Sequence, residues 1–339
     1  MHQVNPALRA SRLLSSEFSA RVFTPDQAQV VGVSRHQLVT AVDHGLLLRV
    51  RRGLYVVEAD FENAVDKRHR HVALCEGVLR SVQDAVISHE SAALIHGLSH
   101  GNGPSGDGRK NQVQITVSGS HHKPAAGFLV SGSELAAEDV VFVDGLPVTS
   151  LARTAVDLAR KHRNPDGLIV VDAAARRLVG DALAESQESA DLRSAVHDAC
   201  LVRPAITELR RAVSGMKGWK GVGFARQAIA LADPAAESAL ESVSRFNAHL
   251  AGLPPALIGW PVFGESGKQY WADFLWKKWM VIGEADGRLK YGLDPAVLFA
   301  EKEREDDLRR AGYTVVRWIW NDAVSYPSPM VRRLEAALR

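Results

Sequence analysis

The sequence predicts a multidomain α+β protein, and three observations lead to this fold class. Its 339 residues exceed the length of about 250 to 300 at which a single hydrophobic core usually stops growing. Helix signals near the N-terminus are followed by a short strand pair, and the C-terminal third alternates helical and strand patterns. We therefore expect three regions, at residues 1–60, 61–231 and 232–339.

Composition narrows the class of protein. An apolar content of 46% with 24% charged residues is typical of a folded soluble chain, and a net charge of +2 means that any nucleic-acid surface must be local. Cys75 and Cys200 are far apart and form no CxxC pair, which indicates a reducing compartment and a packing role for both. The sequence has neither a signal-peptide pattern nor an apolar run of about 18 residues. We expect a cytoplasmic protein without a membrane partner.

The first region has the signals of two short helices and a hairpin. Thr24, followed by proline, is typical of a helix start, and Ser34 is placed to cap a second helix that Gly45 ends. Strand-forming residues then surround Arg52–Gly53, where glycine suits a tight turn. A helix, a turn, a second helix and a basic hairpin are the order of a winged helix-turn-helix.

Such a domain would bind double-stranded DNA through its second helix and its wing. The side chains expected near base edges are those of Arg35, His36, Gln37 and Thr40. The side chains expected near phosphates are those of Arg49, Arg51 and Arg52. The alternative is a helical hairpin whose basic rim contacts another protein.

The segment at residues 21–58, with its "GVSRHQL" turn and "RRGLY" wing, resembles the N-terminal winged-helix domain of the AbiEi antitoxin family. The resemblance implies a protein that binds DNA and represses its own operon. It also implies a toxin as a protein partner.

The middle region reads as an α+β scaffold of helices and short strands. His89, Glu90 and His96 do not have the spacing of HExxH, so they favour a helix over a metal site. The glycine-rich "GPSGDGRK" is not a phosphate loop, because Arg109 stands where lysine is needed. We expect Asp157 to hydrogen-bond its helix to a neighbouring one.

The C-terminal region brings acids into an apolar strand pair. If "YWADFLW" and "WMVIGEADG" pair around a turn at Lys277–Lys278, Asp273 lies opposite Ile282. Strand alternation then places Asp273, Ile282, Glu284 and Asp286 on one face, and the other face forms the core. Carboxylates so close repel one another. A divalent cation, Mg²⁺ or Mn²⁺, would compensate and could activate water against a phosphodiester.

Flanking helices are expected to complete this site. The first, at residues 233–252, would carry Glu237 and Glu241 one turn apart, and either could reach the acids. The inward stripe of the second helix is expected to be Val297, Ala300, Arg304, Leu308 and Ala311. Arg304 occupies an apolar position there, so it needs an anionic partner.

Residues 232–325 resemble the very-short-patch-repair-endonuclease-like branch of the PD-(D/E)XK nuclease superfamily, through "SALESVSR", "ADF" and "GEADG". The resemblance implies a restriction-endonuclease-like α/β domain with a mixed sheet flanked by helices. It also implies that Asp273 and Glu284 bind the metal, that Glu241 helps to hold metal or water, and that Asp286 occupies the position of the motif lysine. The candidates to replace that lysine are Lys290, Lys302 and Arg304.

Two functions follow from these patterns. The first is a DNA-binding, Mg²⁺-dependent endonuclease of a toxin-antitoxin or phage-defence system. The second is a non-catalytic autorepressor or antitoxin of a type IV toxin-antitoxin system, which binds a toxin or forms a homodimer. In the second case the acids would be solvated or paired with Arg304 and Arg309.

Overall fold

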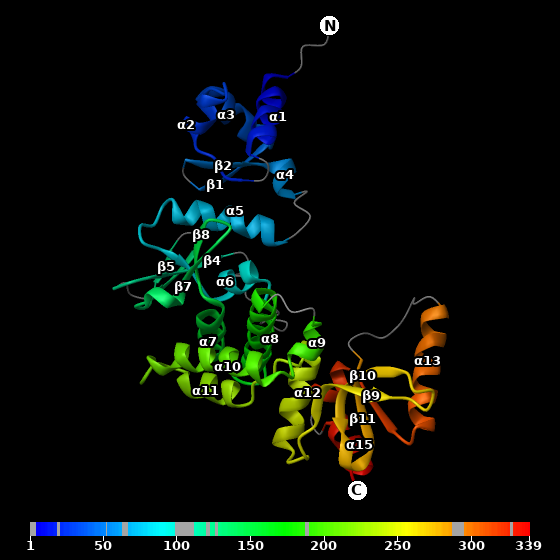
Figure 1. The fold of residues 1–339 in the computed structure, drawn as a ribbon. Coiled ribbons are helices and arrows are strands. Elements are labelled where there is room, and N and C mark those ends of the chain that lie inside the picture. The colour runs from blue at the N-terminus through cyan, green and yellow to red at the C-terminus, as the bar shows by residue number, and fades with distance from the viewer. Residues whose placement is uncertain are drawn as a thin grey trace. The chain divides into compact units, whose positions relative to one another are not determined.

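The computed structural model divides into two compact units. Figure 1 shows their helices and strands, coloured by residue number. Unit 1 contains residues 1–97 and 106–150, and unit 2 contains residues 98–105 and 151–339. The division falls inside the expected middle region. The residues that the structure describes are 5–18, 21–51, 53–62, 67–98, 112–119, 123–125, 128–186, 190–286, 295–325 and 328–339.

Unit 1 begins with four helices and a two-stranded sheet. These elements are α1 (Pro6–Phe18), α2 (Pro25–Val30), α3 (Arg35–Asp43), β1 (Leu47–Arg51), β2 (Leu54–Val57) and α4 (Glu58–Glu62). The predicted helix starts are confirmed, because the hydroxyls of Thr24 and Ser34 each accept a hydrogen bond from the backbone three residues on. The hairpin is confirmed as well, with Gly53 at a φ of +76° in its turn.

The sequence argument missed α1. Its buried residues Ala7, Ala10, Ser11 and Leu14 follow the spacing of one helix face. Leu14 packs with Phe23 and Leu38 in the core of the N-terminal module formed by α1 to α4, β1 and β2. We call this module the head. That periodicity was a signal that could have predicted the helix.

The rest of unit 1 is a six-stranded sheet in the order β5-β6-β4-β3-β8-β7, with two helices. Its elements are α5 (Lys67–Leu79), β3 (Val86–Ile87), α6 (His89–His96), β4 (Val113–Val117), β5 (Lys123–Ala125), β6 (Phe128–Gly132), η1 (Ala137–Asp139), β7 (Val140–Val143) and β8 (Leu146–Thr149). The predicted helix is confirmed at α6, where the Nε2 of His96 lies 2.7 Å from the carbonyl oxygen of Thr149. The loop with Arg109 lies outside the described residues.

Unit 2 opens with a helical layer, formed by α7 (Leu151–Lys161), α8 (Asp166–Ser186), α9 (Leu192–Ala195), α10 (Ala199–Ser214) and α11 (Val222–Ala230). Asp157 does not bond to a neighbouring helix as expected. It accepts from Arg153 at 2.8 Å and Arg160 at 2.7 Å, both on its own helix α7. Both guanidinium groups lie over the ring of Trp219, so the contact between segments is made by the arginines.

The C-terminal part of unit 2 is a four-stranded mixed sheet in the order β12-β11-β10-β9. Its elements are α12 (Ala239–Leu250), β9 (Leu257–Phe263), β10 (Gln269–Trp276), η2 (Lys277–Trp279), β11 (Val281–Ala285), α13 (Pro295–Arg310), β12 (Thr314–Trp318), α14 (Trp320–Val324) and α15 (Pro329–Ala337). β12 is parallel to β11 and the other pairs are antiparallel, which confirms the predicted mixed sheet.

Two other expectations concern the chain as a whole. Cys75 is buried as predicted, whereas Cys200 is exposed and does not have the expected packing role. Among the described residues, no helix is long and apolar enough to cross a membrane.

Aromatic side chains form the core under one face of the four-stranded sheet of β9 to β12. Phe274, Trp276 and Trp318 are each at most 2% exposed. The indole N–H of Trp318 donates to Ser244 at 2.8 Å. Gly283 lies directly against these rings, because a Cβ atom there would be 2.5 Å from the Cη2 atom of Trp318. The closeness of this packing explains why β11 carries glycine at that position.

Gly283→Ala should therefore lower the free energy of unfolding of unit 2 by about 1–3 kcal/mol, the usual effect of overpacking. Urea unfolding followed by tryptophan fluorescence measures the change. Gly223→Ala in α11 is the matched control, because a Cβ atom there meets nothing within 4 Å. Equal stability of the two variants would contradict the packing argument.

Candidate functional site

The acids of the β10–β11 hairpin lie on one face, but in a different register from the one predicted. Leu275, not Asp273, is opposite Ile282, so the predicted pairing is wrong by two residues. The connection is longer than expected, because η2 is followed by Met280 in the left-handed region at a φ of +52°. A shift of two residues preserves the alternation of faces, and the register continues with Asp273 across from Glu284.

Both faces of the sheet are covered, which corrects the expectation of one core face. Leu275 and Ile282, which share the face of the acids, pack against Leu308 of α13. Glu284 is consequently enclosed, at only 6% exposed, whereas Asp273 and Asp286 are half-buried. Because a buried charge is costly unless it is paired, the stability of this arrangement depends on the partners of these carboxylates.

Glu241 reaches this region from the first turn of α12. The helix begins at Ala239, not near residue 233 as expected, because Ser238 caps it. The Glu241 carboxylate accepts from the Ser238 hydroxyl at 2.6 Å and from the Glu237 backbone N–H at 2.8 Å. Glu237 therefore precedes the helix, and its carboxylate pairs with Arg176 and Arg193.

Arg304 has the anionic partner that the sequence required. Its guanidinium lies 2.9 Å from Glu284 and donates to the carbonyl of Trp271 at 2.6 Å. The predicted inward stripe is otherwise incomplete, because Ala300 is exposed. The side chain of Val297 lies outside the described residues.

The other cations are arranged differently from Arg304. Asp286 pairs with Arg317 at 3.2 Å, and Arg317 also pairs with two glutamates of α13. Lys302 is exposed, Arg309 pairs with Glu305 and not with the acids of the sheet, and Lys290 lies outside the described residues. Of the three candidates for the lysine role, Arg304 is the one that the structure places on Glu284.

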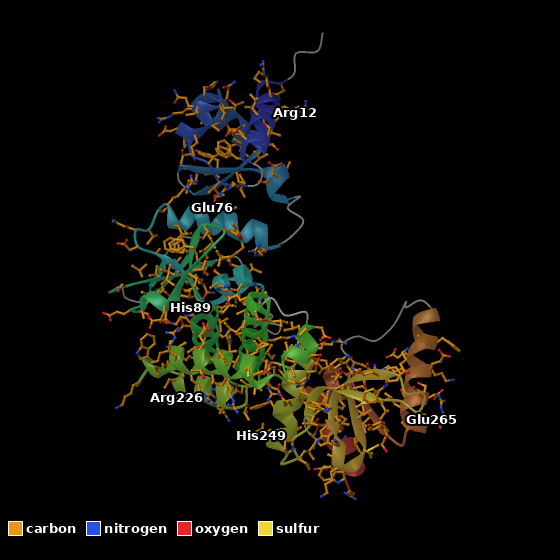
Figure 2. The ribbon with its side chains drawn as sticks, in the orientation of Figure 1. Arg12, Glu76, His89, Arg226, His249 and Glu265 are labelled. Carbon is orange, nitrogen blue, oxygen red and sulfur yellow. The ribbon has the colours of Figure 1, made fainter. Side chains whose placement is uncertain are left out.

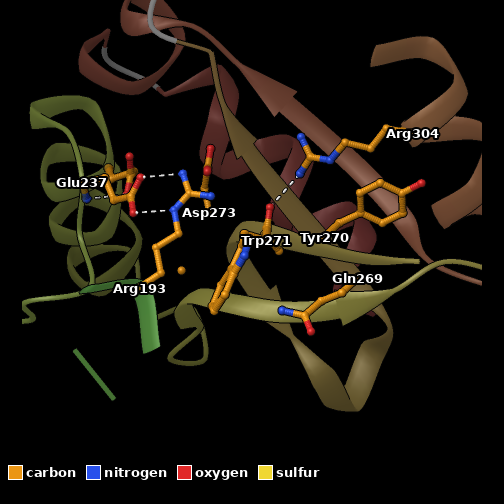
Figure 3. A pocket seen from close by; sticks show the side chains of 10 residues that line it. Arg193, Glu237, Gln269, Tyr270, Trp271, Asp273 and Arg304 are labelled. Atoms are coloured by element: carbon orange, nitrogen blue, oxygen red, sulfur yellow. Dashed lines mark hydrogen bonds and ion pairs between the residues drawn. The ribbon is translucent and has the colours of Figure 1, made fainter. Parts of the chain in front are cut away.

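A pocket of about 310 Å³ opens beside these groups. Figure 3 shows Arg193 bonded to Glu237 on one side and Arg304 bonded to the Trp271 carbonyl on the other. The remaining lining residues are Glu241, Gly259, Gln269, Tyr270, Ala272 and Asp273. The lining mixes both signs of charge.

Burial dominates the electrostatics of the three central acids. It raises the pKa of Glu241 to about 7 and that of Glu284 to about 7, and the nearby Asp273 adds to both shifts. Burial also raises the pKa of Asp273, against the hydrogen bond from the Ala285 N–H and the charge of Arg304. Asp273 thus raises the pKa of both glutamates, and the charge of Arg304 acts on Asp273 and Glu284.

The expected metal ligands do not fit a divalent cation as they are arranged. Across the described parts of the chain, no three His, Cys, Asp or Glu side chains are placed to hold a metal ion. Glu284 is turned to Arg304, Glu241 to the cap of α12, and Asp273 accepts at 2.8 Å from the Ala285 N–H. The predicted Mg²⁺ or Mn²⁺ set of Glu241, Asp273 and Glu284 is therefore not formed by this geometry.

The head places only part of the predicted DNA-contact set in solvent. Arg35, His36 and Arg49 are exposed. Gln37 is not available as predicted, because its side chain accepts from the Ser34 N–H at 2.8 Å and completes the helix cap. The Thr40 hydroxyl donates to the carbonyl of its own helix one turn back, which also corrects the prediction. The side chains of Arg51 and Arg52 lie outside the described residues.

Val39 is an exposed residue of α3 that the sequence argument did not consider. It is 56% exposed on α3, three and four residues after His36 and Arg35, so all three lie on one helix face. An exposed apolar side chain on a basic helix face suits the methyl group of thymine. Its spacing from the two basic residues was the available signal.

Comparison with known proteins assigns two segments of the chain to known families of domains. Residues 11–57 match the model described as "Transcriptional regulator, AbiEi antitoxin", and residues 85–203 match "AbiEi antitoxin C-terminal domain". Two Mycobacterium tuberculosis proteins, Uncharacterized protein Rv2248 (strain H37Rv) and Uncharacterized protein MT2308 (strain CDC 1551), are each 26% identical over 309 residues. The alignments cover 89% of this chain and 96% of each relative, and so extend beyond the segments that the models match.

The raised pKa of Glu241 predicts a pH-dependent stability. The native state keeps a proton that the unfolded chain releases near pH 4.5, so the free energy of unfolding falls as the pH rises from about 4.5 to about 7. Glu241→Gln keeps a side chain that can cap α12 but removes this ionisation. Relative to wild type, it should gain about 2–3 kcal/mol between pH 4.5 and pH 8.

Urea unfolding at a series of pH values measures this difference. Glu335→Gln on the exposed face of α15 is the control, and its profile should run parallel to that of wild type. A Glu241→Gln profile that is also parallel to wild type would show that Glu241 is ionised without penalty.

Proposed function

We propose that this protein is a transcriptional regulator of the antitoxin type, which binds double-stranded DNA through its N-terminal head. The observation that carries the proposal is the head itself, in which α2, α3 and a basic hairpin form within a segment matched by an antitoxin regulator model. Arg35, His36 and Arg49 are exposed on α3 and the hairpin, where Arg35 also pairs with Asp26 at 3.1 Å and the Arg49 side chain faces solvent. A helix of this kind fits the major groove, and the wing lies along the phosphates.

In this function the two parts of the head do different work. His36 and Val39 on α3 contact base edges and set the sequence preference. Arg49 on β1 contacts phosphate and supplies affinity without sequence information. Occupation of a promoter by the bound chain then represses transcription of its own operon.

The C-terminal sheet supports a binding role and not a catalytic one. Glu284 is neutralised by Arg304, and Asp286 is neutralised by Arg317. The Glu241 carboxylate accepts the hydrogen bonds of the α12 cap. With these partners in place, the region serves as a scaffold, and we assign to unit 2 the task of holding a toxin or a second copy of the chain.

A metal-dependent DNA endonuclease is the second candidate function. One observation favours it: Glu241, Asp273 and Glu284 come from three separate elements, Asp273 raises the pKa of both glutamates, and Glu241 and Asp273 line a pocket. Buried, coupled acids of this kind cluster at catalytic sites. Catalysis would require the arginine contacts to open.

The head assignment predicts that His36→Ala with Arg49→Ala lowers DNA affinity about ten-fold or more at low salt, because a base contact and a phosphate contact are lost. Fluorescence anisotropy with duplexes from the chain's own promoter region measures the affinity. Lys277→Ala, an exposed lysine in the β10–β11 turn, is the control for loss of charge. Unchanged affinity of the double variant would remove the proposal, and loss of promoter repression in a reporter strain should accompany loss of binding.

The non-catalytic assignment predicts that the purified chain leaves plasmid DNA intact in Mg²⁺ or Mn²⁺. Agarose electrophoresis over several hours measures cleavage. Nicking that disappears in Asp273→Ala with Glu284→Ala would establish the endonuclease instead, because these two acids lie close enough for Asp273 to raise the pKa of Glu284. Nicking that persists in the double variant would come from a contaminant.

A further inference from the structure

Unit 2 contains a second basic surface, away from the acids of the sheet. Two stretches of the sequence, residues 158–165 and 209–232, contain no Asp or Glu. Their Lys and Arg residues that lie around Trp219 and Phe224 are Arg160, Lys161, Arg163, Lys217, Lys220 and Arg226, which we call the basic ridge. Six positive charges there exceed the net charge of +2 of the whole chain.

Contacts within the fold bring the two stretches together. The Arg160 guanidinium lies 4.7 Å from the ring centroid of Trp219, and that of Arg163 lies 5.4 Å from the ring of Phe224. The Asn164 side chain donates to Gln227 at 3.1 Å. The end of α7, the α10–α11 loop and α11 therefore form one continuous surface.

The charge of this surface is directed to solvent. Lys217, Lys220 and Arg226 are exposed, and none of the three makes an ion pair with a carboxylate in the described parts of the chain. Figure 2 labels Arg226 on the outer side of the helical layer. Asp157 is buried and neutralises part of Arg160, and Asp166 at the start of α8 is the next acid along the chain. The ridge keeps a clear excess of positive charge.

We propose that the basic ridge binds the phosphodiester backbone of double-stranded DNA, as a second contact in addition to the head. Charge complementarity supports an anionic partner, and several exposed lysines and arginines on one helical surface match repeated phosphates. Single-stranded nucleic acid is disfavoured, because it requires free aromatic faces and here guanidinium groups already lie over Trp219 and Phe224. The inference rests on the proposed function only in that the chain must bind DNA.

The test compares two matched pairs of lysines in the full-length chain. Lys217→Ala with Lys220→Ala removes two charges from the ridge, and Lys277→Ala with Lys278→Ala removes two from the exposed β10–β11 turn. Anisotropy with one 30-base-pair duplex is measured over a salt series. The ridge pair should reduce the slope of log K against log salt by about 1 to 2 and weaken binding several-fold at low salt, whereas the turn pair leaves both unchanged.

The outcomes separate the ridge from the head. No DNA binding by wild type would remove the proposed function itself. Wild-type binding with an unchanged slope in the ridge pair, or an equal change in both pairs, would overturn the ridge alone. Competition by single-stranded DNA or RNA that exceeds competition by duplex would also overturn it. Equal melting temperatures of wild type and both variants confirm that the fold is intact, and Lys217→Arg with Lys220→Arg, which keeps both charges, should leave the slope at the wild-type value.

Discussion

Enclosed carboxylates are the constraint on which the C-terminal part of this protein depends. Asp273 and Glu284 face each other across a hairpin that is covered on both faces, and a charge taken out of water must be compensated. Arg304 supplies the compensation from α13, and it also bonds the β10 backbone. The position of α13 on the sheet therefore depends on an ion pair as well as on apolar packing. Buried ion pairs contribute little net stability, but they strongly disfavour arrangements that leave one partner alone.

The same device recurs through the helical layer. Asp172 of α8 is 1% exposed and accepts from Arg245 of α12 at 2.7 Å, while burial raises its pKa to about 6. Asp157 is held by two arginines that also cover an aromatic ring. Acid and arginine pairs thus fix which helices contact one another in unit 2. These pairs favour one arrangement of the helices, and the carboxylates of Asp172 and Asp157 are held by arginines of the same unit.

Two populations of cations follow from this arrangement, and in the proposed function they are how a nearly neutral chain would bind DNA. Arginines such as Arg245 and Arg304 are committed to internal acids. Exposed cations such as Arg49 and Lys220 face solvent and remain available to an external anion. Affinity and specificity are separated in the same way, since phosphates are contacted by charge and bases by the outward face of α3. A regulator built on this plan needs no reaction to act.

The sequence determined the local elements, because caps, glycine turns and alternation depend on neighbouring residues. It predicted α2, α3, the wing and the shared face of Asp273 and Glu284, and it required an anionic partner for Arg304. Only the tertiary structure decided the hairpin register, which a left-handed Met280 sets, and the use of Gln37 in a cap. It also decided that Glu284 pairs with Arg304, whereas the sequence predicted that Glu241, Asp273 and Glu284 converge on a metal ion. Contacts between distant segments depend on packing, which no local pattern specifies.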